Sequence, residues 1–379
     1  MIYLDNAAST RLLPEVLAAM QPFFGEEYGN PSSPHAAGRA SRRAVEDARE
    51  IVAACLGADP KEIVFTSGAT EANALALAGV AEAHREKGGR ILTTAIEHPS
   101  VLETCGRLQA GGFTVTRVLP DSRGVLDPSV VGDAWTPDTV LMSVIHVNNE
   151  TGAIQPIASL RRRIPSGFLH VDAAQAVGKV PVSTVDADLL TLSSHKMHGP
   201  KGVGALWVRR RVPLSAQHVG GGQEFERRAG TENVAGIVGM AEAMRIACRD
   251  LRANAARMTS LRGRLLEGLR RTGGLLVHGD PDASAPHILN VSFEGAESEA
   301  LILALDAEGV CVSAGSACAA MSAEPSHVLR AMGVSSERSR EAVRFSVSAL
   351  TTAEEVDAAA EVARRSVARL RKGAPAGRR

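Results

Sequence analysis

The sequence has no net charge, few aromatic residues and no long apolar run. Its 42 lysine and arginine residues balance 42 aspartate and glutamate residues, so no net charge draws it to nucleic acid or to an anionic membrane. We find no apolar stretch near the roughly 20 residues that a membrane-spanning helix needs. The first ten residues, MIYLDNAAST, contain Asp5 and lack the basic and apolar segments of a signal peptide. These absences predict a soluble, cytoplasmic protein that binds neither nucleic acid nor membrane.

Cysteine is also scarce, because the chain has only five and none lies in a CxxC or Cys/His arrangement. This number and spacing argue against a disulfide framework and against a metal site. Cys55, Cys105 and Cys248 fall in line with apolar residues at helical spacing, so we expect them to be small core residues. Two cysteines seven residues apart, Cys311 and Cys318, remain as candidates for chemistry.

Apolar strand-like runs alternate with amphipathic helical stretches between residues 61 and 208. This alternation is typical of a wound α/β sheet in which most strands are parallel. The expected helices between the strands include residues 70–87 and 100–110. The seven expected strands are residues 62–66, 90–96, 114–118, 139–146, 167–172, 188–193 and 204–210.

A long helical tract over residues 235–271 follows this pattern, with apolar residues at helical spacing. We therefore predict a large domain over residues 1–250 and a smaller α+β domain over residues 251–379, which carries Cys318. The N-terminal segment 1–12 is expected to pack with the smaller domain. The strands expected in the smaller domain are residues 287–293, 309–313 and 342–348.

Three segments place polar residues where expected strands end. Lys196 follows an apolar strand and precedes glycines, and taken alone it reads as a solvated strand end. Asp172 ends another strand, and Gln175 follows it. Residues 67–70 lead from a strand into a helix, where free backbone N–H groups and the positive end of the helix dipole favour an anion. That junction is also consistent with an ordinary helix cap at Thr70.

Together these segments predict a site for pyridoxal 5′-phosphate. The helix end with Thr70 would hold the phosphate, Asp172 would keep the pyridine nitrogen protonated, and Lys196 would form the Schiff base. His98 also follows a strand end and is placed to cover the ring and move protons, although a histidine before proline is often a helix cap. Few other aromatic groups can stack on the ring, because the chain has only two Trp and two Tyr.

Several motifs in this order carry a family resemblance: SGATEAN, HVNNETG, HVDAAQ, SSHKMHGPKG, RRAGTEN and SAGSAC. The sequence resembles the cysteine desulfurases of the NifS/IscS type, within the class V aminotransferase-like enzymes of PLP fold type I. The resemblance runs from YLDNAAST near the N-terminus to LRKG near the end, so it covers nearly the whole chain. It implies the fold-type I architecture and a dependence on pyridoxal 5′-phosphate.

The resemblance also implies roles for individual residues. Arg344 matches the arginine that binds the substrate carboxylate, a task that suits its bidentate guanidinium. Thr231 matches a threonine that reaches the phosphate of the neighbouring subunit, which implies a homodimer. Ser194 stands where relatives can have glycine, a change expected to affect local packing. The remaining cofactor-binding positions are Ala69, Thr70, Ser193 and His195 at the phosphate, with Asn149 and Gln175 near the ring oxygen and the substrate.

The implied reaction converts L-cysteine to L-alanine and leaves the sulfur as a persulfide on Cys318. Cys318 sits among small residues, in a stretch that matches the family's sulfur-accepting loop, whereas Cys311 lies between two valines and reads as structural. An acceptor protein for iron–sulfur cluster assembly or thiolation would take the sulfur. The alternatives are a selenocysteine lyase or an aminotransferase on the same scaffold, and, in a different class, a non-catalytic sulfur-transfer subunit.

Overall fold

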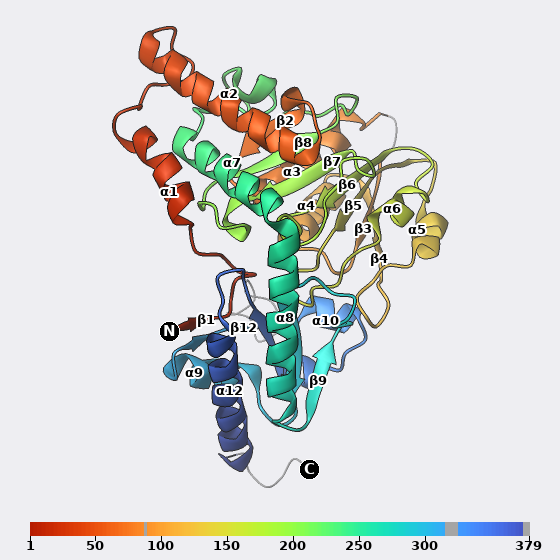
Figure 1. Cartoon of the computed structure of the whole chain (residues 1–379). Helices are drawn as coiled ribbons and strands as arrows, with labels where there is room; N and C mark the ends of the chain where they lie inside the picture. Colours follow the sequence, from red (N-terminus) through yellow and green to blue (C-terminus); the bar gives the residue numbers. More distant parts are fainter. Residues whose placement is uncertain (87–88, 315–324, 374–379) are drawn as a thin grey trace.

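The computed structural model describes residues 1–86, 89–314 and 325–373 of the 379-residue chain. It contains a seven-stranded sheet, a four-stranded sheet and a short two-stranded pairing. Figure 1 shows the seven-stranded sheet in the upper part of the molecule and the four-stranded sheet below it. In the described ranges, no helix is both long enough and apolar enough to cross a membrane.

The seven-stranded sheet has the order β2-β8-β7-β6-β5-β3-β4. All neighbours are parallel except β8, which runs antiparallel to both β2 and β7. The predicted wound and mostly parallel sheet is therefore confirmed. The strands are β2 (Ile63–Thr66), β3 (Arg90–Thr94), β4 (Thr114–Val118), β5 (Thr139–Ile145), β6 (Phe168–Asp172), β7 (Leu189–Ser193) and β8 (Gly204–Val208).

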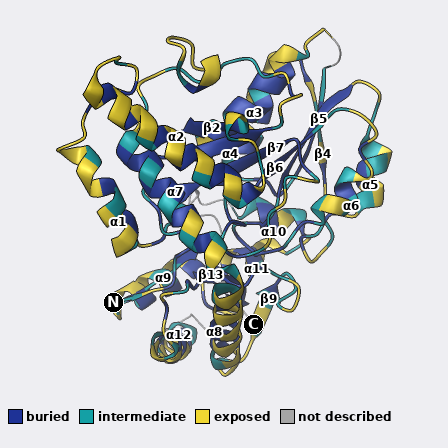
Figure 2. Ribbon diagram, turned by 45° about the horizontal axis from the view of Figure 1, so that its top comes forward, coloured by how far each residue is buried: buried dark blue, intermediate teal, exposed yellow. Residues whose placement is uncertain are grey.

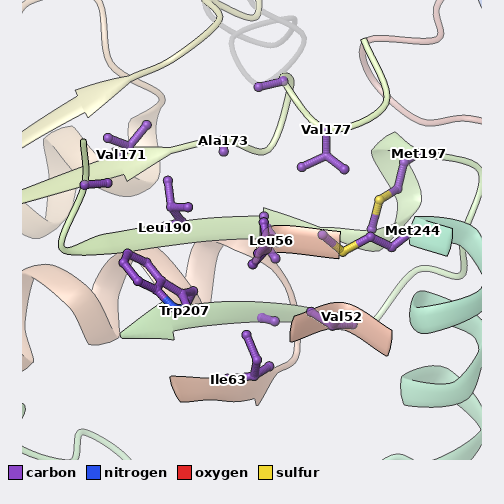
Figure 3. Packing of buried hydrophobic residues seen from close by; sticks show 14 of the residues in the cluster. Val52, Leu56, Ile63, Val171, Ala173, Val177, Leu190, Met197, Trp207 and Met244 are labelled. Carbon is purple, nitrogen blue, oxygen red and sulfur yellow. The ribbon is translucent and has the colours of Figure 1, made fainter. Parts of the chain in front are cut away.

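Helices cover both faces of this sheet, which explains why its strands read as continuous apolar runs. Successive residues of a strand point to opposite faces, and in β8 Trp207 joins one core while Leu206 joins the other. On the Trp207 face, α2 (Ala36–Leu56) and α7 (Val234–Arg249) complete the core, as the close view in Figure 3 shows. On the opposite face lie α3 (Ala69–Ala83) and α4 (Pro99–Ala110).

The four-stranded sheet is antiparallel, with the order β12-β13-β10-β9. A separate apolar core packs it against three helices: α8 (Leu251–Arg270), α9 (Ser298–Ala307) and α12 (Ala353–Gly373). The outer faces of α8 and α12 are exposed, as the yellow segments in Figure 2 show. The strands are β9 (Leu275–His278), β10 (Ile288–Phe293), β12 (Ser313–Ala314) and β13 (Ala342–Ser346).

Two expected elements are divided in the structure. The tract 235–271 is two helices, because the backbone at Asp250 (φ −100°, ψ 7°) leaves the helical conformation between α7 and α8. This break turns the chain from the larger sheet toward the smaller one (Figure 1). The expected strand 309–313 is also divided into two short strands that belong to different sheets. β11 (Val310–Cys311) pairs with β1 (Ile2–Tyr3), whereas β12 pairs with β13.

The N-terminal segment runs from the smaller sheet to the edge of the larger one. After β1, the Asn6 side chain donates to the Ser346 carbonyl at 2.9 Å, and further along Thr10 N donates to the His195 carbonyl at 2.9 Å. The segment therefore bridges the two sheets. The remaining helices are short: α1 (Pro14–Met20), α5 (Pro128–Ala134), α6 (Ile157–Arg161), α10 (His327–Ala331) and α11 (Ser336–Arg340), with 3-10 turns at Gln21–Phe24, Pro60–Glu62, Ser194–Lys196 and Gln223–Glu226.

Candidate active site

A cavity of about 470 Å³ opens where the parallel strands of the larger sheet end. Its volume lies in the range of small-molecule sites, and the carboxyl edge of an open α/β sheet is where such sites form. Residues from the N-terminal segment and from β13 close its other sides. Ten of the predicted site residues line it: Ala69, Thr70, His98, Asn149, Asp172, Gln175, Ser193, His195, Lys196 and Arg344.

Lys196 lies in the 3-10 turn that directly follows β7. Its Nζ donates to the carbonyl oxygens of Ala7 at 2.7 Å and Ala8 at 2.8 Å. Its own carbonyl accepts a hydrogen bond from Lys179 Nζ at 2.6 Å. Gly199 lets this turn close, because a Cβ there would lie 2.0 Å from the Ser194 hydroxyl. The N-terminal segment therefore holds the amine in the cavity wall, and Lys179 holds the backbone of the turn.

Lys179 is a second amine behind Lys196. Burial lowers its pKa to about 7, and the positive charge of Lys196 contributes to the same shift. Both lysines line a smaller cavity of about 270 Å³, on the side of α7 and the N-terminal segment. Lys179 places its positive charge near Lys196 and supports its backbone at the same time.

Asp172 ends β6 and is almost fully buried. Its Oδ2 accepts a hydrogen bond from Asn73 Nδ2 at 2.8 Å, and its Oδ1 accepts one from the Ala174 backbone N–H at 3.0 Å. Two donors thus hold the carboxylate in one orientation at the cavity wall. This arrangement suits a carboxylate that must meet a protonated ring nitrogen.

His98 is a helix cap, as its sequence position suggested, and it also lies at the cavity. It is the N-cap of α4, where its Nδ1 accepts from the Ser100 backbone N–H at 3.1 Å, and it also lines the cavity. Burial lowers the pKa of His98; the Asp172 carboxylate opposes this shift, and Lys196 and His327 add to it. The imidazole is therefore neutral near pH 7.

The turn between β2 and α3 is the segment for which the sequence predicted a phosphate site. Gly68 (φ 154°) is the N-cap of α3 and makes no side-chain cap, so the first backbone N–H groups of the helix have no intrahelical acceptor. Gly204 of β8 passes so close that a Cβ on it would lie 2.7 Å from the Gly68 Cα. The alternative interpretation, a cap at Thr70, is wrong because the helix begins one residue earlier, at Ala69.

Arg344 of β13 lies at the far side of the cavity, with its side chain 2% exposed. Its Nη2 donates to Asp5 Oδ1 at 2.9 Å and its Nη1 donates to the Asn149 carbonyl at 2.8 Å. Its Nε is buried and has no partner among the described residues. A guanidinium with an unused donor at a cavity wall can bind a substrate carboxylate by donating hydrogen bonds to it.

Two predicted residues do not join this group. Thr231 is exposed and lines a separate cavity of about 100 Å³, which shares Ser67 and Gly202 with the main cavity. Cys318 lies outside the described residues. Of the three cysteines expected in the core, Cys105 is fully buried, whereas Cys55 and Cys248 are half-buried at the edge of the core between α2 and α7. Cys311 lies in β11, as expected.

The structure adds residues that the sequence did not single out. The Ala7 and Ala8 carbonyls hold Lys196, and backbone atoms leave no residue-type signal to find them. Asn73 is fully buried on the sheet-facing side of α3 among apolar residues. A polar residue in such a helical stripe was the available signal, because a buried amide needs partners. Among the described residues, no cluster of His, Cys, Asp and Glu could hold a metal ion.

These residues fit pyridoxal 5′-phosphate. The uncapped start of α3 provides N–H donors for a phosphate, and the tight approach of Gly204 leaves room there for no side chain. At other points of the same cavity lie the doubly held carboxylate of Asp172 and the amine of Lys196. Phosphate seat, ring-nitrogen partner and amine are the three groups that the cofactor requires.

Known proteins share both the sequence and the fold of this chain. The sequence model of the aminotransferase class-V family matches residues 2–359. Cysteine desulfurase IscS of Klebsiella pneumoniae subsp. pneumoniae is 45% identical, over 99% of this chain and 94% of its own length. A solved NifS-like protein matches with a TM-score of 0.91 and 40% identity, over 96% of this chain and 98% of its own. The solved structure of SspA in complex with cysteine matches with a TM-score of 0.82 and 36% identity, over 93% of this chain and all of its own.

The fold, the site and these similarities define the class: the chain belongs to the aminotransferase class-V family, whose members are enzymes that depend on pyridoxal 5′-phosphate. Within that family, the chain belongs to the cysteine desulfurases of the NifS/IscS type. The fold class and the family predicted from the sequence motifs are both confirmed.

Proposed function

We propose that the protein removes the sulfur of L-cysteine, releases L-alanine and holds the sulfur as a persulfide on Cys318. The observation that supports this most directly is that Lys196, Asp172, His98 and Arg344 line one cavity, at walls supplied by different elements. Bound pyridoxal 5′-phosphate supplies an electron sink for the bonds at the substrate Cα. The remaining steps belong to side chains of this protein.

Each of the four side chains has a task that follows from its surroundings. The Arg344 guanidinium binds the substrate carboxylate and so orients Cα within the cavity. Asp172, fixed by two donors, would pair with the ring nitrogen of the cofactor and favour its protonated form. Lys196 Nζ would hold the cofactor covalently, and as a free amine it would take the proton from the substrate Cα. His98, neutral at pH 7, lines the same cavity and is placed to hydrogen-bond the substrate.

The described residues on both sides of Cys318 are fixed at the cavity. Before it, Ser313 of β12 pairs with Arg344 in the sheet. After it, the Ser326 hydroxyl donates to the buried Glu150 carboxylate at 2.5 Å, and Glu150 lines the cavity. Twelve residues, Cys318 among them, lie between these two anchors in the sequence. We propose that the Cys318 thiolate attacks the substrate sulfur, so that an S–S bond forms as the Cβ–S bond breaks and the carbon skeleton, after protonation, leaves as alanine.

The test of this function is Cys318→Ser, with Cys311→Ser as the matched control. The first variant is expected to keep the absorption band of the bound cofactor but to lose alanine formation from cysteine and the persulfide seen by mass spectrometry. The control changes a thiol only seven residues earlier in the chain, in β11, and is expected to retain all three. Full alanine production by Cys318→Ser would overturn the assignment of Cys318 as nucleophile.

We also propose a homodimer in which Thr231 serves the phosphate of the partner subunit. Thr231 is exposed and points to a surface cavity beside Ser67 in the isolated chain, which is compatible with a task outside its own site. A reduced, cytoplasmic setting fits the unpaired cysteines among the described residues. The sulfur acceptor is proposed to be a protein of iron–sulfur cluster assembly or of thiolation. Mixing inactive Thr231→Ala and Lys196→Ala subunits tests the dimer, because exchange is expected to restore activity to hybrid sites.

The division of the chain near residue 250 likewise remains a proposal. It is supported by the separate apolar cores of the two sheets and by the break between α7 and α8. Limited proteolysis is the direct test, with cleavage near that break expected before cleavage inside either core.

A further inference from the structure

A line of hydrogen bonds runs from Asp172 to His98 through two side chains to which no role has been given so far. Asn73 Nδ2 donates to Asp172 Oδ2 at 2.8 Å and to the Ser100 hydroxyl at 2.9 Å. The Ser100 hydroxyl in turn lies 2.8 Å from His98 Nδ1. Asn73 comes from the first turns of α3, and Ser100 from the first turn of α4. The line thus joins two residues of the active site through the starts of two packed helices.

The direction of every bond in this line is fixed by its ends. A carboxylate oxygen accepts, so Asn73 must turn its NH₂ group toward Asp172, and the same group then faces Ser100. The Ser100 hydroxyl accepts from Asn73 and keeps its own proton for His98 Nδ1. The Ser100 backbone N–H also points at Nδ1, at 3.1 Å, and a backbone N–H only donates. Nδ1 therefore receives two hydrogen bonds and carries no proton.

A neutral imidazole with a bare Nδ1 carries its proton on Nε2. Nδ1 is hydrogen-bonded to Ser100 at the start of α4. Nε2 is therefore the ring nitrogen that can hydrogen-bond a molecule in the cavity that His98 lines. We propose that Ser100 and Asn73 are positioning residues that hold His98 in the Nε2–H form, so that His98 presents a hydrogen-bond donor, not a lone pair, to the substrate. This inference rests on the proposed function for its substrate, but not for the state of the ring.

The charged groups around His98 are compatible with the Nε2–H tautomer. Asp172, Lys196 and His327 are the titratable groups that act on His98. Among these, Asp172 is the one that favours a protonated ring, and it is occupied by Asn73 Nδ2 and by the Ala174 N–H. Protonation at Nδ1 would place two donors face to face at the Ser100 N–H. The line of hydrogen bonds therefore opposes the imidazolium form as well as the other tautomer.

The test is ¹⁵N NMR of the histidine rings in the holoenzyme, with His98→Gln used to assign the signal. In the unmodified protein, His98 is expected to show an unprotonated Nδ1 and a protonated Nε2 near pH 7. Ser100→Ala removes one donor to Nδ1, so the titration midpoint of His98 is expected to rise by about 0.5 to 1 pH unit. Ser100→Thr keeps the hydroxyl and is expected to restore the original midpoint.

The chain offers a matched control in a second helix start of the same kind. Ser129 donates its backbone N–H and its hydroxyl to the N-cap Asp127, at 2.8 and 2.7 Å, as Ser100 does to His98. Ser129→Ala removes the same kind of contact at an exposed site and is expected to leave the His98 signal unchanged. A protonated Nδ1 in the unmodified enzyme, or an equal effect of the two serine variants, would overturn the proposal.

The proposed tautomer of His98 and the proposed desulfurase function can be refuted independently of each other. The NMR measurement needs no turnover, so the unmodified spectrum decides the tautomer even where a variant does not fold. A correct Nε2–H tautomer in a protein that makes no alanine from cysteine would refute the function and leave the ring assignment intact. As a second perturbation, Asn73→Ala frees the Ser100 hydroxyl to turn, and the titration midpoint of His98 is expected to rise as in Ser100→Ala, while the Ser100 backbone N–H still keeps Nδ1 unprotonated in the neutral ring.

Discussion

Arg344 Nη2 lies 2.9 Å from Asp5 Oδ1, and this ion pair joins the N-terminal segment to β13 at the wall of the active site. Arg344 is buried by this contact and by its hydrogen bond to the Asn149 carbonyl. The guanidinium is therefore held in place before substrate arrives. Such preorganisation means that little side-chain ordering is left for the binding step.

Arg344→Lys keeps the positive charge and removes the planar fork of donors. A single ammonium cannot satisfy Asp5, the Asn149 carbonyl and a substrate carboxylate together. We expect KM for cysteine to rise at least about tenfold, in keeping with the loss of one charge-assisted hydrogen bond. The cofactor absorption band should persist, because Arg344 has no proposed task at the phosphate. An unchanged KM would contradict the proposed carboxylate site.

Lys196→Ala is expected to abolish the absorption band of covalently bound cofactor together with alanine formation. The covalent link to the cofactor needs an amine at this point of the cavity. Among the described lysines, only Lys196 has its Nζ hydrogen-bonded to the Ala7 and Ala8 carbonyls there. Lys61→Ala is the control, because Lys61 is exposed in the turn before β2. Absorption spectra of the two purified variants test whether Lys196 binds the cofactor covalently, and a normal band in Lys196→Ala would refute that role.

Glu97 gives a prediction for stability against pH. Burial raises its pKa to about 8, and Asp172 contributes in the same direction, while hydrogen bonds from Thr94 and from the Ile145 N–H oppose the shift. Between pH 4.5 and 8 the folded protein therefore binds a proton that the unfolded chain does not. The stability contributed by this group falls as pH rises through that window, by up to about 1.4 kcal/mol per pH unit.

Glu97→Gln should remove this contribution, because an amide neither gains nor loses the proton. Urea unfolding at pH 5.5 and pH 8 is expected to show a smaller loss of stability in Glu97→Gln than in the unmodified protein. Glu50→Gln, at an exposed position of α2, should leave the pH dependence unchanged. An identical pH dependence in all three proteins would show that Glu97 is ionised in the folded state.

A buried ion pair away from the active site fixes the loop that contains Thr231. Arg49 of α2 makes two hydrogen bonds to Glu224, at 2.9 and 2.8 Å, and the two side chains are 3% and 2% exposed. Glu224 and the next two residues have positive φ values of 47°, 59° and 63°, so this pair supports a strained turn. Its loss should therefore affect both stability and the position of the loop.

Glu224→Gln removes the buried counterion of Arg49 and leaves only the longer contact, 3.4 Å, to the exposed Glu46 carboxylate. We expect a loss of about 3 to 5 kcal/mol in the free energy of unfolding, measured by urea denaturation. Replacing both residues by Met should cost much less than the single change, because no uncompensated charge remains. Equal losses in the single and double variants would assign the effect to the turn and not to the charge.

The sequence was sufficient for the larger sheet and for most of the site. The inner strands of that sheet are covered on both faces, so their apolar runs are unambiguous, and parallel strands bring Asp172, Lys196 and His98 to one edge. Short strands were harder, since β9 has exposed positions such as Leu276 and an apolar run of only three residues. The break at Asp250 was missed because apolar residues keep helical spacing on both sides of it.

The parts of the site that escaped prediction depend on contacts between distant segments. No local pattern shows that the Ala7 and Ala8 carbonyls meet Lys196, or that Asp5 meets Arg344. Asn73 and Ser100 also acquire their task only when α3 and α4 pack together. Helical and strand periodicity report which face a residue occupies, but not which residue of another element it meets there.

The bridge formed by the N-terminal segment has a consequence for how the enzyme is made. Asn6 bonds to Ser346, which is 340 positions later in the chain, and the carbonyls that hold Lys196 follow Asn6 directly. At roughly 5 to 20 residues per second, the ribosome needs on the order of tens of seconds to supply β13 after the first residues emerge. During that interval the larger sheet can form while Asn6 still lacks its Ser346 partner and the cavity still lacks Arg344. A nascent or truncated chain is therefore unable to assemble its catalytic centre, and the enzyme becomes competent only near the end of its own synthesis.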